Sequence, residues 1–323
     1  MPPSPFPVLT PSSLQPLAAA FAGRLQPEVS LARYTAARVG GPADALLEVH
    51  SADELAAAVS LLWKAELPYA ILGGGSNVLV SDAGVRGVVV LNRARAVRFD
   101  EQAEPPTVWA ESGANFGVIA RQAAQRGLAG LEWAAGIPGT VGGAVFGNAG
   151  AHGGDMAGNL VLAEILHLSG GEPLPEPRRE EWPLERLGLQ YRSSWLKRSP
   201  EKAVVLSAHL KLERSTPQAV QTSLDEFVTY RRHTQPPGAS MGSMFKNPPG
   251  DYAGRLIEAV GLKGVRIGNA QISPLHANFF VNHGEASAAD VFALIELARQ
   301  RVAEKFSLEL ELEIELLGDW EGK

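Results

Sequence analysis

The sequence predicts an α+β protein with a larger N-terminal part and a smaller C-terminal part. Four segments carry apolar residues at the spacing of an amphipathic helix, and segments typical of strands lie between them. A chain of 323 residues is also long enough for two or three structural units with a sizeable core. We place the division between the two parts near Ser215, where a strand pattern gives way to a helix pattern.

The helical spacing defines four segments. Residues 52–64 begin with two acidic side chains, which suit the positive end of a helix. Residues 115–126 are followed by Gly127, as expected at a helix C-terminus. Residues 217–232 have proline in their first turn, and residues 288–306 form a second strong apolar repeat.

Strand patterns account for the segments between these helices. Apolar runs at residues 69–72, 78–80 and 88–91 indicate strands in the first half of the chain. Residues 203–213 alternate apolar and polar side chains, and residues 308–317 alternate leucine or isoleucine with glutamate. Such alternation is typical of strands with one buried face. We expect residues 170–183, rich in proline and charge, to form an exposed connection.

These patterns predict the domain organisation. Residues 1–30 are rich in proline and are expected to form a loose N-terminal lead. Residues 31–214 would form the first domain, with two subdomains and a boundary near residue 95. Residues 215–318 would form the second domain, and residues 319–323 a tail.

The composition excludes several kinds of site and partner. The absence of cysteine excludes disulfides, thiolate-bound metals, iron–sulfur clusters and thiol nucleophiles. Redox chemistry would need an organic cofactor or a metal held by other ligands, and we assign no metal site. A net charge of −6 argues against nucleic-acid binding, and no apolar run approaches the length of a membrane span. The first residues lack a signal-peptide layout, so we expect a cytoplasmic protein.

Two glycine-rich runs carry the strongest functional signal. The first is Gly73-Gly74-Gly75-Ser76-Asn77, after an apolar strand, and the second extends from Gly136 to Ala144. Glycine lets backbone amides approach an anion without an intervening Cβ, so the pair indicates a cofactor that contains a diphosphate. Neither run continues into Gly-Lys, which excludes a P-loop. The first run leads into a strand rather than a helix, which excludes a Rossmann fingerprint.

Further motifs occur with these runs in a fixed order along the chain. They are Arg38-Val39-Gly40-Gly41-Pro42-Ala43, Tyr191-Arg192-Ser193-Ser194 and Gly242-Ser243-Met244-Phe245-Lys246-Asn247-Pro248. From about Tyr34 to Gly318 the chain resembles the UDP-N-acetylenolpyruvoylglucosamine reductase family. The resemblance implies a FAD-binding domain of the vanillyl-alcohol-oxidase type over residues 31–214. It also implies a smaller α+β substrate-binding domain over residues 215–318, whose last strand carries a catalytic glutamate.

The resemblance also implies the activity. A cytoplasmic flavoenzyme with non-covalent FAD would reduce UDP-N-acetylglucosamine enolpyruvate to UDP-N-acetylmuramate in peptidoglycan precursor synthesis, with NADPH as co-substrate and no implied protein partner. The alkene of this substrate carries a carboxylate, so hydride delivered to its terminal carbon places negative charge on the carboxylate oxygens. The protein must stabilise that enolate, supply a proton to the adjacent carbon and hold the flavin against the alkene.

Three residues are assigned to the chemistry by this resemblance. Arg192 would bind the carboxylate through its guanidinium, although the family usually has aspartate where Ser193 stands. Ser243 would donate the proton, a task that requires stabilisation of its developing alkoxide. Glu313 would share or relay that proton. Alternation alone does not distinguish Glu313 from the other glutamates between residues 309 and 315.

The remaining site predictions concern the two ligands. FAD is expected on Gly73, Gly74, Gly75, Ser76, Asn77, Gly136, Ile137, Gly139, Thr140, Val141, Gly142 and Gly143, with Ile137 and Val141 packed against the flavin. The UDP-sugar is expected on Lys246, Asn247, Gln271 and Asn278. Arg231 and Arg232 fit its diphosphate, but a solvated helix end explains them equally well.

Two other functions stay open from the sequence. The chain fits another FAD-dependent oxidase of the same fold, although it has no cysteine, and no histidine between His50 and His152, for covalent attachment of the flavin. It also fits a non-catalytic protein that binds a nucleotide sugar. Bound flavin, seen as absorbance near 450 nm, and its reduction by NADPH distinguish these alternatives.

Overall fold

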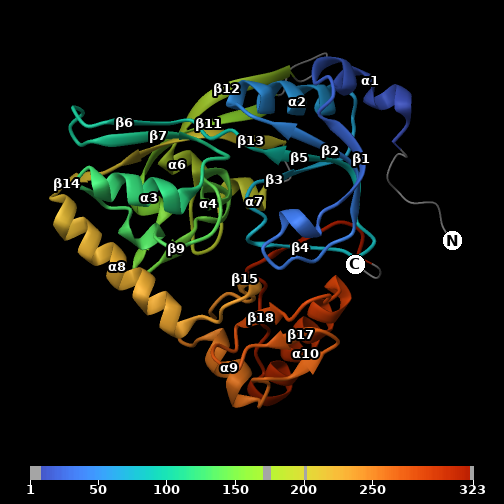
Figure 1. Cartoon of the computed structure of the whole chain (residues 1–323), viewed down its shortest axis with the longest axis vertical. Helices are drawn as coiled ribbons and strands as arrows, with labels where there is room; N and C mark the ends of the chain where they lie inside the picture. Colours follow the sequence, from blue (N-terminus) through green and yellow to red (C-terminus); the bar gives the residue numbers. More distant parts are fainter. Residues whose placement is uncertain (1–8, 170–175, 200–201, 321–323) are drawn as a thin grey trace.

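The computed structural model describes residues 9–169, 176–199 and 202–320. Two large sheets form an upper body, and a third sheet with its own helices forms a lower lobe (Figure 1). Helix α8 (Pro217–Thr234) runs along one side from the upper body to the lower lobe. Within the described ranges, no helix is long and apolar enough to cross a bilayer.

The first sheet has four strands in the order β1-β2-β5-β3. Strand β1 pairs antiparallel with β2, whereas β2 and β3 both pair parallel with β5. The predicted apolar runs at 69–72 and 88–91 lie in β3 and β5. The strand bounds are Leu25–Ser30 (β1), Pro42–Val49 (β2), Tyr69–Leu72 (β3) and Val85–Asn92 (β5).

The second sheet is antiparallel and has five strands in the order β12-β11-β13-β7-β6. Its first strand along the chain begins at Val97, whereas the first sheet ends at Asn92, and the expected subdomain boundary near residue 95 stays a prediction. The bounds are Val97–Asp100 (β6), Thr107–Glu111 (β7), Leu160–Ser169 (β11), Glu176–Pro183 (β12) and Ala203–Lys211 (β13). The predicted strand at 203–213 continues as β14 (Glu213–Arg214), which pairs with β8 (Leu128–Ala129).

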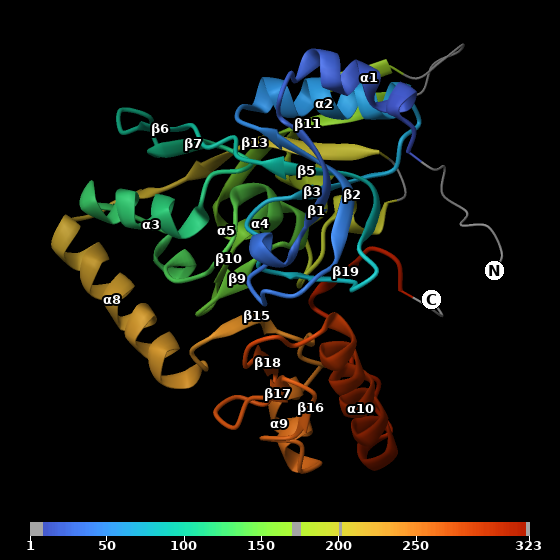
Figure 2. The ribbon, with the colours of Figure 1, turned by 45° about the vertical axis from the view of Figure 1, so that its right-hand side comes forward.

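Helix α2 (Ala52–Lys64) lies between these two sheets (Figure 2). Its apolar face includes Leu55 and Leu62, which are fully buried in one cluster with Val90 of the first sheet and Leu206 of the second. Burial of each such side chain contributes about 1.5–3 kcal/mol. The Ser51 hydroxyl accepts a hydrogen bond from Glu54 N at 3.1 Å and fixes the start of the helix.

The other face of the five-stranded sheet is covered by α3 (Phe116–Gln125) and α4 (Val141–Gly147). Asn115 caps α3 through a hydrogen bond from Val118 N to its Oδ1 at 2.9 Å. The second glycine run is therefore the entry into α4, on the inner side of this layer. Short elements complete the upper body: η1 (Ala32–Tyr34), η2 (Glu132–Ala134), β4 (Val78–Val80), β9 (Gly150–Ala151), β10 (Gly154–Asp155), α5 (Met156–Asn159), α6 (Leu184–Leu187) and α7 (Trp195–Arg198).

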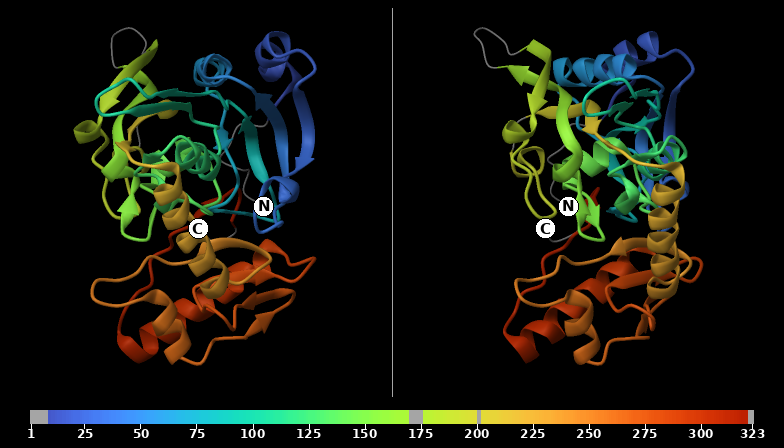
Figure 3. Two further views of the ribbon diagram at one scale, coloured as in Figure 1. Left: turned by 60° about the vertical axis from the view of Figure 1, so that its left-hand side comes forward. Right: turned by 90° about the vertical axis from the view of Figure 1, so that its left-hand side faces the viewer.

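The lower lobe is an antiparallel sheet in the order β15-β18-β17-β16 with two helices on one face (Figure 3). Helix α10 begins at the upper body, because both carboxylate oxygens of Asp82 accept 2.8 Å hydrogen bonds, from Ala288 N and Ala289 N. The bounds are Ala239–Ser243 (β15), Ala253–Ala259 (α9), Arg266–Ile267 (β16), Ala270–Ile272 (β17), Phe279–Asn282 (β18) and Ala288–Phe306 (α10).

Helix α8 packs on the upper body rather than on the lower lobe. Its buried Val220 and Leu224 cluster with Ala124 of α3 and Ala135. The helix also extends two residues beyond the predicted end at Arg232, to Thr234. Because α8 follows Ser215 yet packs on the first part of the chain, the proposed boundary near residue 215 stays a prediction.

The end of the chain returns from the lower lobe to the upper body, where β19 (Glu315–Leu317) pairs parallel with β4 (Figure 2). The prediction of one strand over residues 308–317 is wrong in length, since residues 308–314 pair only through an isolated bridge between Leu312 and Phe245. The predicted buried face is nevertheless present, because Leu310 and Ile314 are each 3% exposed in the core of the lower lobe.

Two other expectations need correction. The loose lead expected over residues 1–30 is, from Pro11 onward, helix α1 (Pro11–Ala20) and edge strand β1; residues 1–8 lie outside the described residues. Thr10 and Ser13 form a capping box, and Leu17 is 1% exposed. The exposed connection expected at 170–183 is, over residues 176–183, edge strand β12, while residues 170–175 lie outside the described residues.

Candidate active site

The two glycine runs lie against each other at the centre of the upper body. A Cβ added to Gly73 would lie 2.4 Å from Thr140 Oγ1, and one added to Gly139 would lie 2.9 Å from Ser76 Oγ. A Cβ on Gly74 would lie 3.1 Å from Gly139 Cα. Each run therefore places a hydroxyl over a glycine of the other, and side chains larger than glycine would force the runs apart.

The first run has backbone amides free for an anion. Within the described residues, the amides of Gly74, Gly75, Ser76 and Asn77 donate no hydrogen bond, although Gly75 is buried. Gly75 has φ of +60°, and a Cβ there would lie 2.0 Å from Tyr34 O, so only glycine fits. Successive free amides next to the Ser76 and Thr140 hydroxyls suit the diphosphate expected from the sequence.

In the second run, several backbone amides already donate hydrogen bonds within the protein, so fewer of them are free for an anion than the sequence suggested. Val141 N donates to Ala114 O at 3.0 Å, Gly142 N donates to Ser112 O at 2.7 Å, and Ile137 N donates to Ala134 O at 3.1 Å. Val141 is fully buried in the core, so it cannot pack against a flavin as expected, whereas Ile137 is partly exposed. A Cβ on Gly142 would meet Ser112 rather than open space.

Gly143 differs from Gly142 in what surrounds it. It is exposed, and outside the backbone of its own helix the nearest neighbour of an added Cβ would be Thr140 Oγ1 at 3.9 Å. The exposed residues of the second run are Gly136, Pro138 and Gly143, while Gly139 and Thr140 lie against the first run. Gly136 instead lies against Arg231, whose Cδ would be 3.4 Å from an added Cβ.

Arg192 and Glu313 meet where the end of the chain crosses into the upper body. Arg192 Nε donates to Glu313 Oε1 at 2.7 Å, and Arg192 Nη2 donates to Gly150 O at 2.7 Å. Arg192 occupies the left-handed region with φ of +53°, which is uncommon for a residue other than glycine. Ser193, where the family usually has aspartate, instead accepts a hydrogen bond from Arg198 Nη1. Glu313 and the Gly150 carbonyl therefore orient Arg192.

Glu313 is held at the same time by the first glycine run and by Met244, the residue that follows β15. Asn77 Nδ2 donates to Glu313 O at 3.1 Å, and Glu313 N donates to Met244 O at 2.9 Å. Burial raises the pKa of the Glu313 carboxyl above its usual range, while the positive charges of Arg192, Lys197 and Lys246 oppose that shift. The side chain of Asn77 is thus used by Glu313, so its backbone amide is the part available to a diphosphate.

Three alternate glutamates of this segment each pair with a different cation. Glu311 pairs with Lys246, Glu313 with Arg192, and Glu315 with Lys197. The Glu313 and Arg192 side chains are 18% and 22% exposed, against 73% for Glu311. Glu313 is therefore the most buried of the three carboxylates, and the acidic face predicted by the alternation is a row of ion pairs.

Ser243 lies at the end of β15, beside Met244, which holds Glu313. Its hydroxyl has no hydrogen-bond partner among the described residues, and its backbone pairs with Phe279 of β18. The register of the sheet places Ser243, Val281 and Gln271 on one face, because Gln271 pairs with Val281 and Phe279 lies two residues before Val281. The opposite face carries Phe280 and Ile272 into the core with α9 and α10.

The four residues expected on the UDP-sugar differ in how open they are. Asn278 is 3% exposed, and its side-chain amide both accepts from Phe245 N at 2.9 Å and donates to Phe245 O at 2.8 Å. It therefore fixes the segment after Ser243. Asn247 Oδ1 accepts from Ala253 N at the start of α9, and Asn247 N donates to the Tyr191 hydroxyl at 3.3 Å.

The side chains of Gln271 and Lys246 each have polar partners within the protein. Gln271 Nε2 donates to Gly264 O, and its Oε1 lies 2.7 Å from His283 Nε2. The side chain of Lys246 is 13% exposed, with Glu311 as its partner. These contacts place both residues at the edge of the face that carries Ser243, whereas Asn278 is a support below it.

An unpaired cation lies beside the second glycine run. The guanidinium of Arg231, on α8, makes no ion pair or hydrogen bond with the described residues, and burial lowers its pKa. The ring of His152 stacks on Phe227 at 4.3 Å, and burial together with the charge of Arg231 lowers the pKa of His152. A guanidinium without an acidic partner, next to Gly136, favours a bound anion over a solvated helix end.

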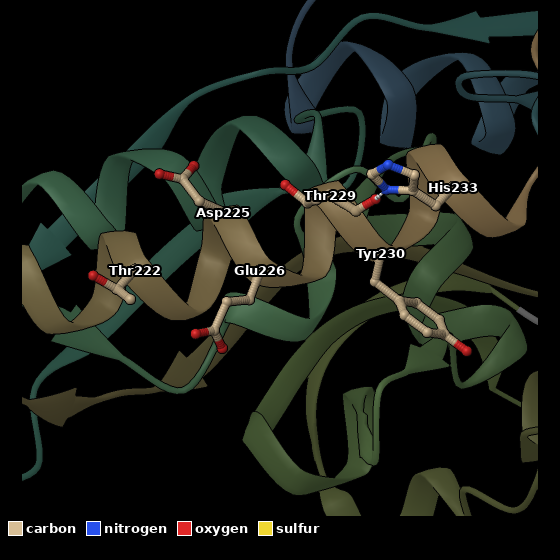
Figure 4. Close-up of a pocket in the computed structure, with 6 residues that line it drawn as sticks. All are labelled: Thr222, Asp225, Glu226, Thr229, Tyr230 and His233. Atoms are coloured by element: carbon tan, nitrogen blue, oxygen red, sulfur yellow. Dashed lines mark hydrogen bonds between the residues drawn. The ribbon is translucent and has the colours of Figure 1, made fainter.

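The hollow along α8 is a separate feature (Figure 4). Its volume is about 590 Å³, and the six side chains that line it all come from this helix. Its side chains lie along one face of the helix, and His233 Nδ1 lies 2.8 Å from Thr229 O. None of the predicted site residues lines this hollow. Its lining is Thr222, Asp225, Glu226, Thr229, Tyr230 and His233.

Two residues near the site were missed by the sequence reasoning. Lys197 lies five residues after Arg192, beyond the end of the motif at residues 191–194, and it pairs with Glu315. His152 closes the glycine-rich stretch after the second run and has a φ of +53°. No pattern in the sequence indicates that its ring stacks on α8, because the partner is 75 residues away along the chain.

Comparisons with known proteins agree with this arrangement. A model of FAD binding domains matches residues 43–168, and a model of the C-terminal domain of UDP-N-acetylenolpyruvoylglucosamine reductase matches residues 233–317. The UDP-N-acetylenolpyruvoylglucosamine reductase of Rubrobacter xylanophilus is 47% identical over 291 residues, which cover 90% of this chain and 94% of the relative. The UDP-N-acetylenolpyruvoylglucosamine reductase of Chloroflexus aggregans is 44% identical over 296 residues, which cover 91% of this chain and 97% of the relative.

A solved structure extends the similarity to the fold. The crystal structure of UDP-N-acetylenolpyruvylglucosamine reductase from Thermus caldophilus superposes with a TM-score of 0.75 at 38% identity, and the match covers 91% of this chain and 99% of that one. The predicted α+β fold, with a FAD-binding domain followed by the C-terminal domain of this reductase family, is confirmed.

Proposed function

Because the chain belongs to the UDP-N-acetylenolpyruvoylglucosamine reductase family, we propose that Arg192, Ser243 and Glu313 act on the enolpyruvyl group of its substrate. The enzyme reduces UDP-N-acetylglucosamine enolpyruvate to UDP-N-acetylmuramate with NADPH, in peptidoglycan precursor synthesis, and its cofactor is FAD. The observation that carries the assignment is the Arg192–Glu313 ion pair, held against the first glycine run by Asn77. The oxidase alternative does not account for the match at residues 233–317, and reduction of the bound flavin by NADPH distinguishes the enzyme from a non-catalytic binding protein.

The glycine runs fit the cofactor. The free amides from Gly74 to Asn77, with the Ser76 and Thr140 hydroxyls, would hold the diphosphate of FAD, and the open face of Gly143 would let it approach. When bound, FAD carries hydride between NADPH and the alkene. Gly142 and Val141 support the run from behind rather than touch the cofactor.

Arg192 has the geometry to stabilise the enolate. Its Nε and Nη2 are held by Glu313 and Gly150, and its Nη1 has no partner among the described residues. A guanidinium fixed at two nitrogens can direct the third toward a carboxylate without reorganisation. As negative charge grows on the carboxylate oxygens, its interaction with Arg192 strengthens, which lowers the barrier.

Ser243 and Glu313 are suited to deliver the proton. The Ser243 hydroxyl is free of internal partners, and the backbone of its neighbour Met244 binds Glu313. In the proposed step, the Oγ–H bond of Ser243 breaks, and its proton forms a C–H bond at the carbon next to the carboxylate. Burial of Glu313 raises the pKa of its carboxyl, so this group holds a proton closer to neutral pH than an exposed glutamate and can return one to Ser243.

The UDP part of the substrate has a set of proposed contacts. Lys246, Asn247 and Gln271 lie on or beside the face that carries Ser243, and Arg231 supplies an unpaired cation from α8. Their arrangement favours binding between α8 and the lower lobe. Asn278 is proposed to act indirectly, because both ends of its amide are bound to Phe245.

The variants Glu313→Gln and Glu311→Gln test this assignment. They remove the same charge from neighbouring positions of one segment, and each breaks one ion pair. We expect Glu313→Gln to bind FAD and to be reduced by NADPH normally, while reoxidation of its flavin by the enolpyruvyl substrate slows by roughly 10²-fold or more. Glu311→Gln should stay within a few-fold of wild type. Equal rates for both variants in reoxidation would remove Glu313 from the mechanism.

A further inference from the structure

One short segment supplies two of the three cations that bind the glutamate row. Arg192 and Lys197 both belong to residues 190–198, and they pair with Glu313 and Glu315, which are also neighbours on one side of an alternating segment. The third pair, Lys246 with Glu311, comes from the lower lobe instead. The segment at 190–198 thus holds the returning chain at two successive positions.

The segment that supplies the two cations is rigid. Gln190 and Ser193 close a turn through two backbone hydrogen bonds, from Gln190 N to Ser193 O at 2.9 Å and from Ser193 N to Gln190 O at 3.0 Å. Ser194 is fully buried, caps α7 and donates to Phe146 O at 2.6 Å. The ring of Trp195 meets Trp182 edge to face at 4.9 Å. Arg192 and Lys197 are therefore presented at fixed positions.

Besides these ion pairs, the glutamate segment is held by hydrogen bonds from Lys246 N to Glu311 O and from Asn77 Nδ2 to Glu313 O, and by the parallel pairing of β19 with β4. Glu313 N donates to Met244 O and Glu315 N donates to Asn77 O, but residues 308–314 form no continuous ladder. A shift by one residue would expose the buried Leu310 and Ile314, whereas a shift by two residues would keep leucine or isoleucine on the core side and glutamate on the other. A shift by two residues would bring Glu315 or Glu311 to Arg192 in place of Glu313.

We propose that Lys197 is a positioning residue for the reaction: by occupying Glu315 it fixes the register in which Glu313 meets Arg192. The inference rests on the proposed role of Glu313. Lys197 is only 18% exposed and Glu315 is 38% exposed, so this pair is less screened by water than a surface ion pair.

Lys197 also acts on Glu313 through its charge. The charged groups that face Glu313 are Arg192, Lys197 and Lys246, together with the carboxylates of Glu311 and Glu315. The positive charge of Lys197 lowers the pKa of Glu313 against the opposing effect of burial. Loss of this charge would therefore raise the pKa of Glu313. The limb of the pH–rate profile that reports titration of Glu313 would then move to higher pH, whether the acid or the base form of Glu313 is needed.

The test compares Lys197→Met, Lys197→Arg and Glu315→Gln as holoenzymes. Stopped-flow absorbance near 450 nm follows flavin reduction by NADPH and reoxidation by the enolpyruvyl substrate, each across a range of pH. Lys263→Met is the matched control, because it breaks a 2.8 Å ion pair with Glu258 elsewhere in the lower lobe.

We expect Lys197→Met to slow reoxidation about tenfold or more, since small misplacements of catalytic groups cost up to about 10²-fold. The limb of its pH–rate profile for reoxidation should move to higher pH, and its flavin should be reduced by NADPH at the normal rate. Lys197→Arg should restore both the rate and the limb. Glu315→Gln breaks the same pair but keeps the charge of Lys197, so reoxidation should slow without an upward shift of the limb.

Different results would overturn the inference. If Lys197→Met slows both half-reactions equally and leaves the limb in place, as a structural ion pair such as that of Lys263 would, Lys197 has no positioning role. If Glu313→Gln slows reoxidation but Lys197→Met and Glu315→Gln do not, the inference fails while the proposed function stands. If Glu313→Gln has no effect, the proposed function fails and this inference fails with it.

Discussion

Gly142 and Gly143 are adjacent in α4, but the structure predicts opposite effects of adding one methyl group to each. A Cβ on Gly142 would lie 2.9 Å from Ser112 Cβ and 3.1 Å from Ser112 O, so the backbone or Ser112 must move. Such overpacking costs about 1–3 kcal/mol. On Gly143 the nearest neighbour would be 3.9 Å away, and alanine in place of glycine within a helix is favourable by roughly 0.5–1 kcal/mol.

The two variants should affect FAD binding in the opposite order to their effects on stability, with the larger loss of affinity at Gly143. The open face of Gly143 is where we place the cofactor, so Gly143→Ala should weaken FAD binding by about 1–3 kcal/mol, or roughly 5- to 100-fold in Kd. Gly142→Ala should lower the apo-protein Tm by several degrees, at roughly 2–4 °C for each kcal/mol. The sequence alone places both glycines on the cofactor, so these two variants also test which of them contacts FAD.

Thermal unfolding of the apo proteins and FAD titration by flavin fluorescence measure the two effects separately. The reasoning is refuted if Gly143→Ala binds FAD as tightly as wild type while Gly142→Ala loses affinity without losing apo stability. That result would mean that Gly142 faces the cofactor and that the packing of α4 on Ser112 is not as described.

Two other predictions concern the site and its cofactor. Arg192→Lys should slow flavin reoxidation by roughly 10- to 100-fold, because a charged hydrogen bond contributes about 1.5–3 kcal/mol. One ammonium cannot replace the 2.7 Å hydrogen bonds to Glu313 and Gly150 and also bind a carboxylate. Turnover near that of wild type would exclude Arg192 from the mechanism. Acid precipitation should release all the yellow colour, because the chain has no cysteine and no histidine between His50 and His152; flavin retained in the pellet would show covalent attachment.

The elements that the sequence predicted well are those with a local cause. The bounds of α2 and α10 agree with the predicted residues 52–64 and 288–306, because each has a cap at its start and an apolar repeat along its length. Helix α1 was missed because its prolines suggest an irregular chain, although Pro11 lies in the first turn and Thr10 caps the helix. Strand β12 was missed because its exposed, charged face shows no apolar alternation, as is usual at a sheet edge.

The site depends on contacts that no local pattern contains. Arg192 and Glu313 are 121 residues apart, and Asn77 and Glu313 are 236 residues apart. The alternation of residues 308–317 predicted which face the glutamates share but not which cation meets each one, because the cations come from other elements. For the same reason the sequence did not show that the amides of the second glycine run are partly used by Ser112 and Ala114.

The central claim is that Ser243 protonates the enolate in one of the two half-reactions, and Ser243→Ala tests it most directly. Ser240→Ala is the matched control, since Ser240 lies on the same strand and pairs with Val281. In stopped-flow absorbance near 450 nm, we predict that Ser243→Ala is reduced by NADPH at the wild-type rate, because hydride transfer to the flavin needs no proton from this hydroxyl. Reoxidation by the enolpyruvyl substrate should slow by about 10²–10⁴-fold, the usual contribution of a general acid, and Ser240→Ala should behave as wild type. Equal slowing of both steps in Ser243→Ala, or an unchanged rate of reoxidation, would contradict the account and place the proton donor elsewhere.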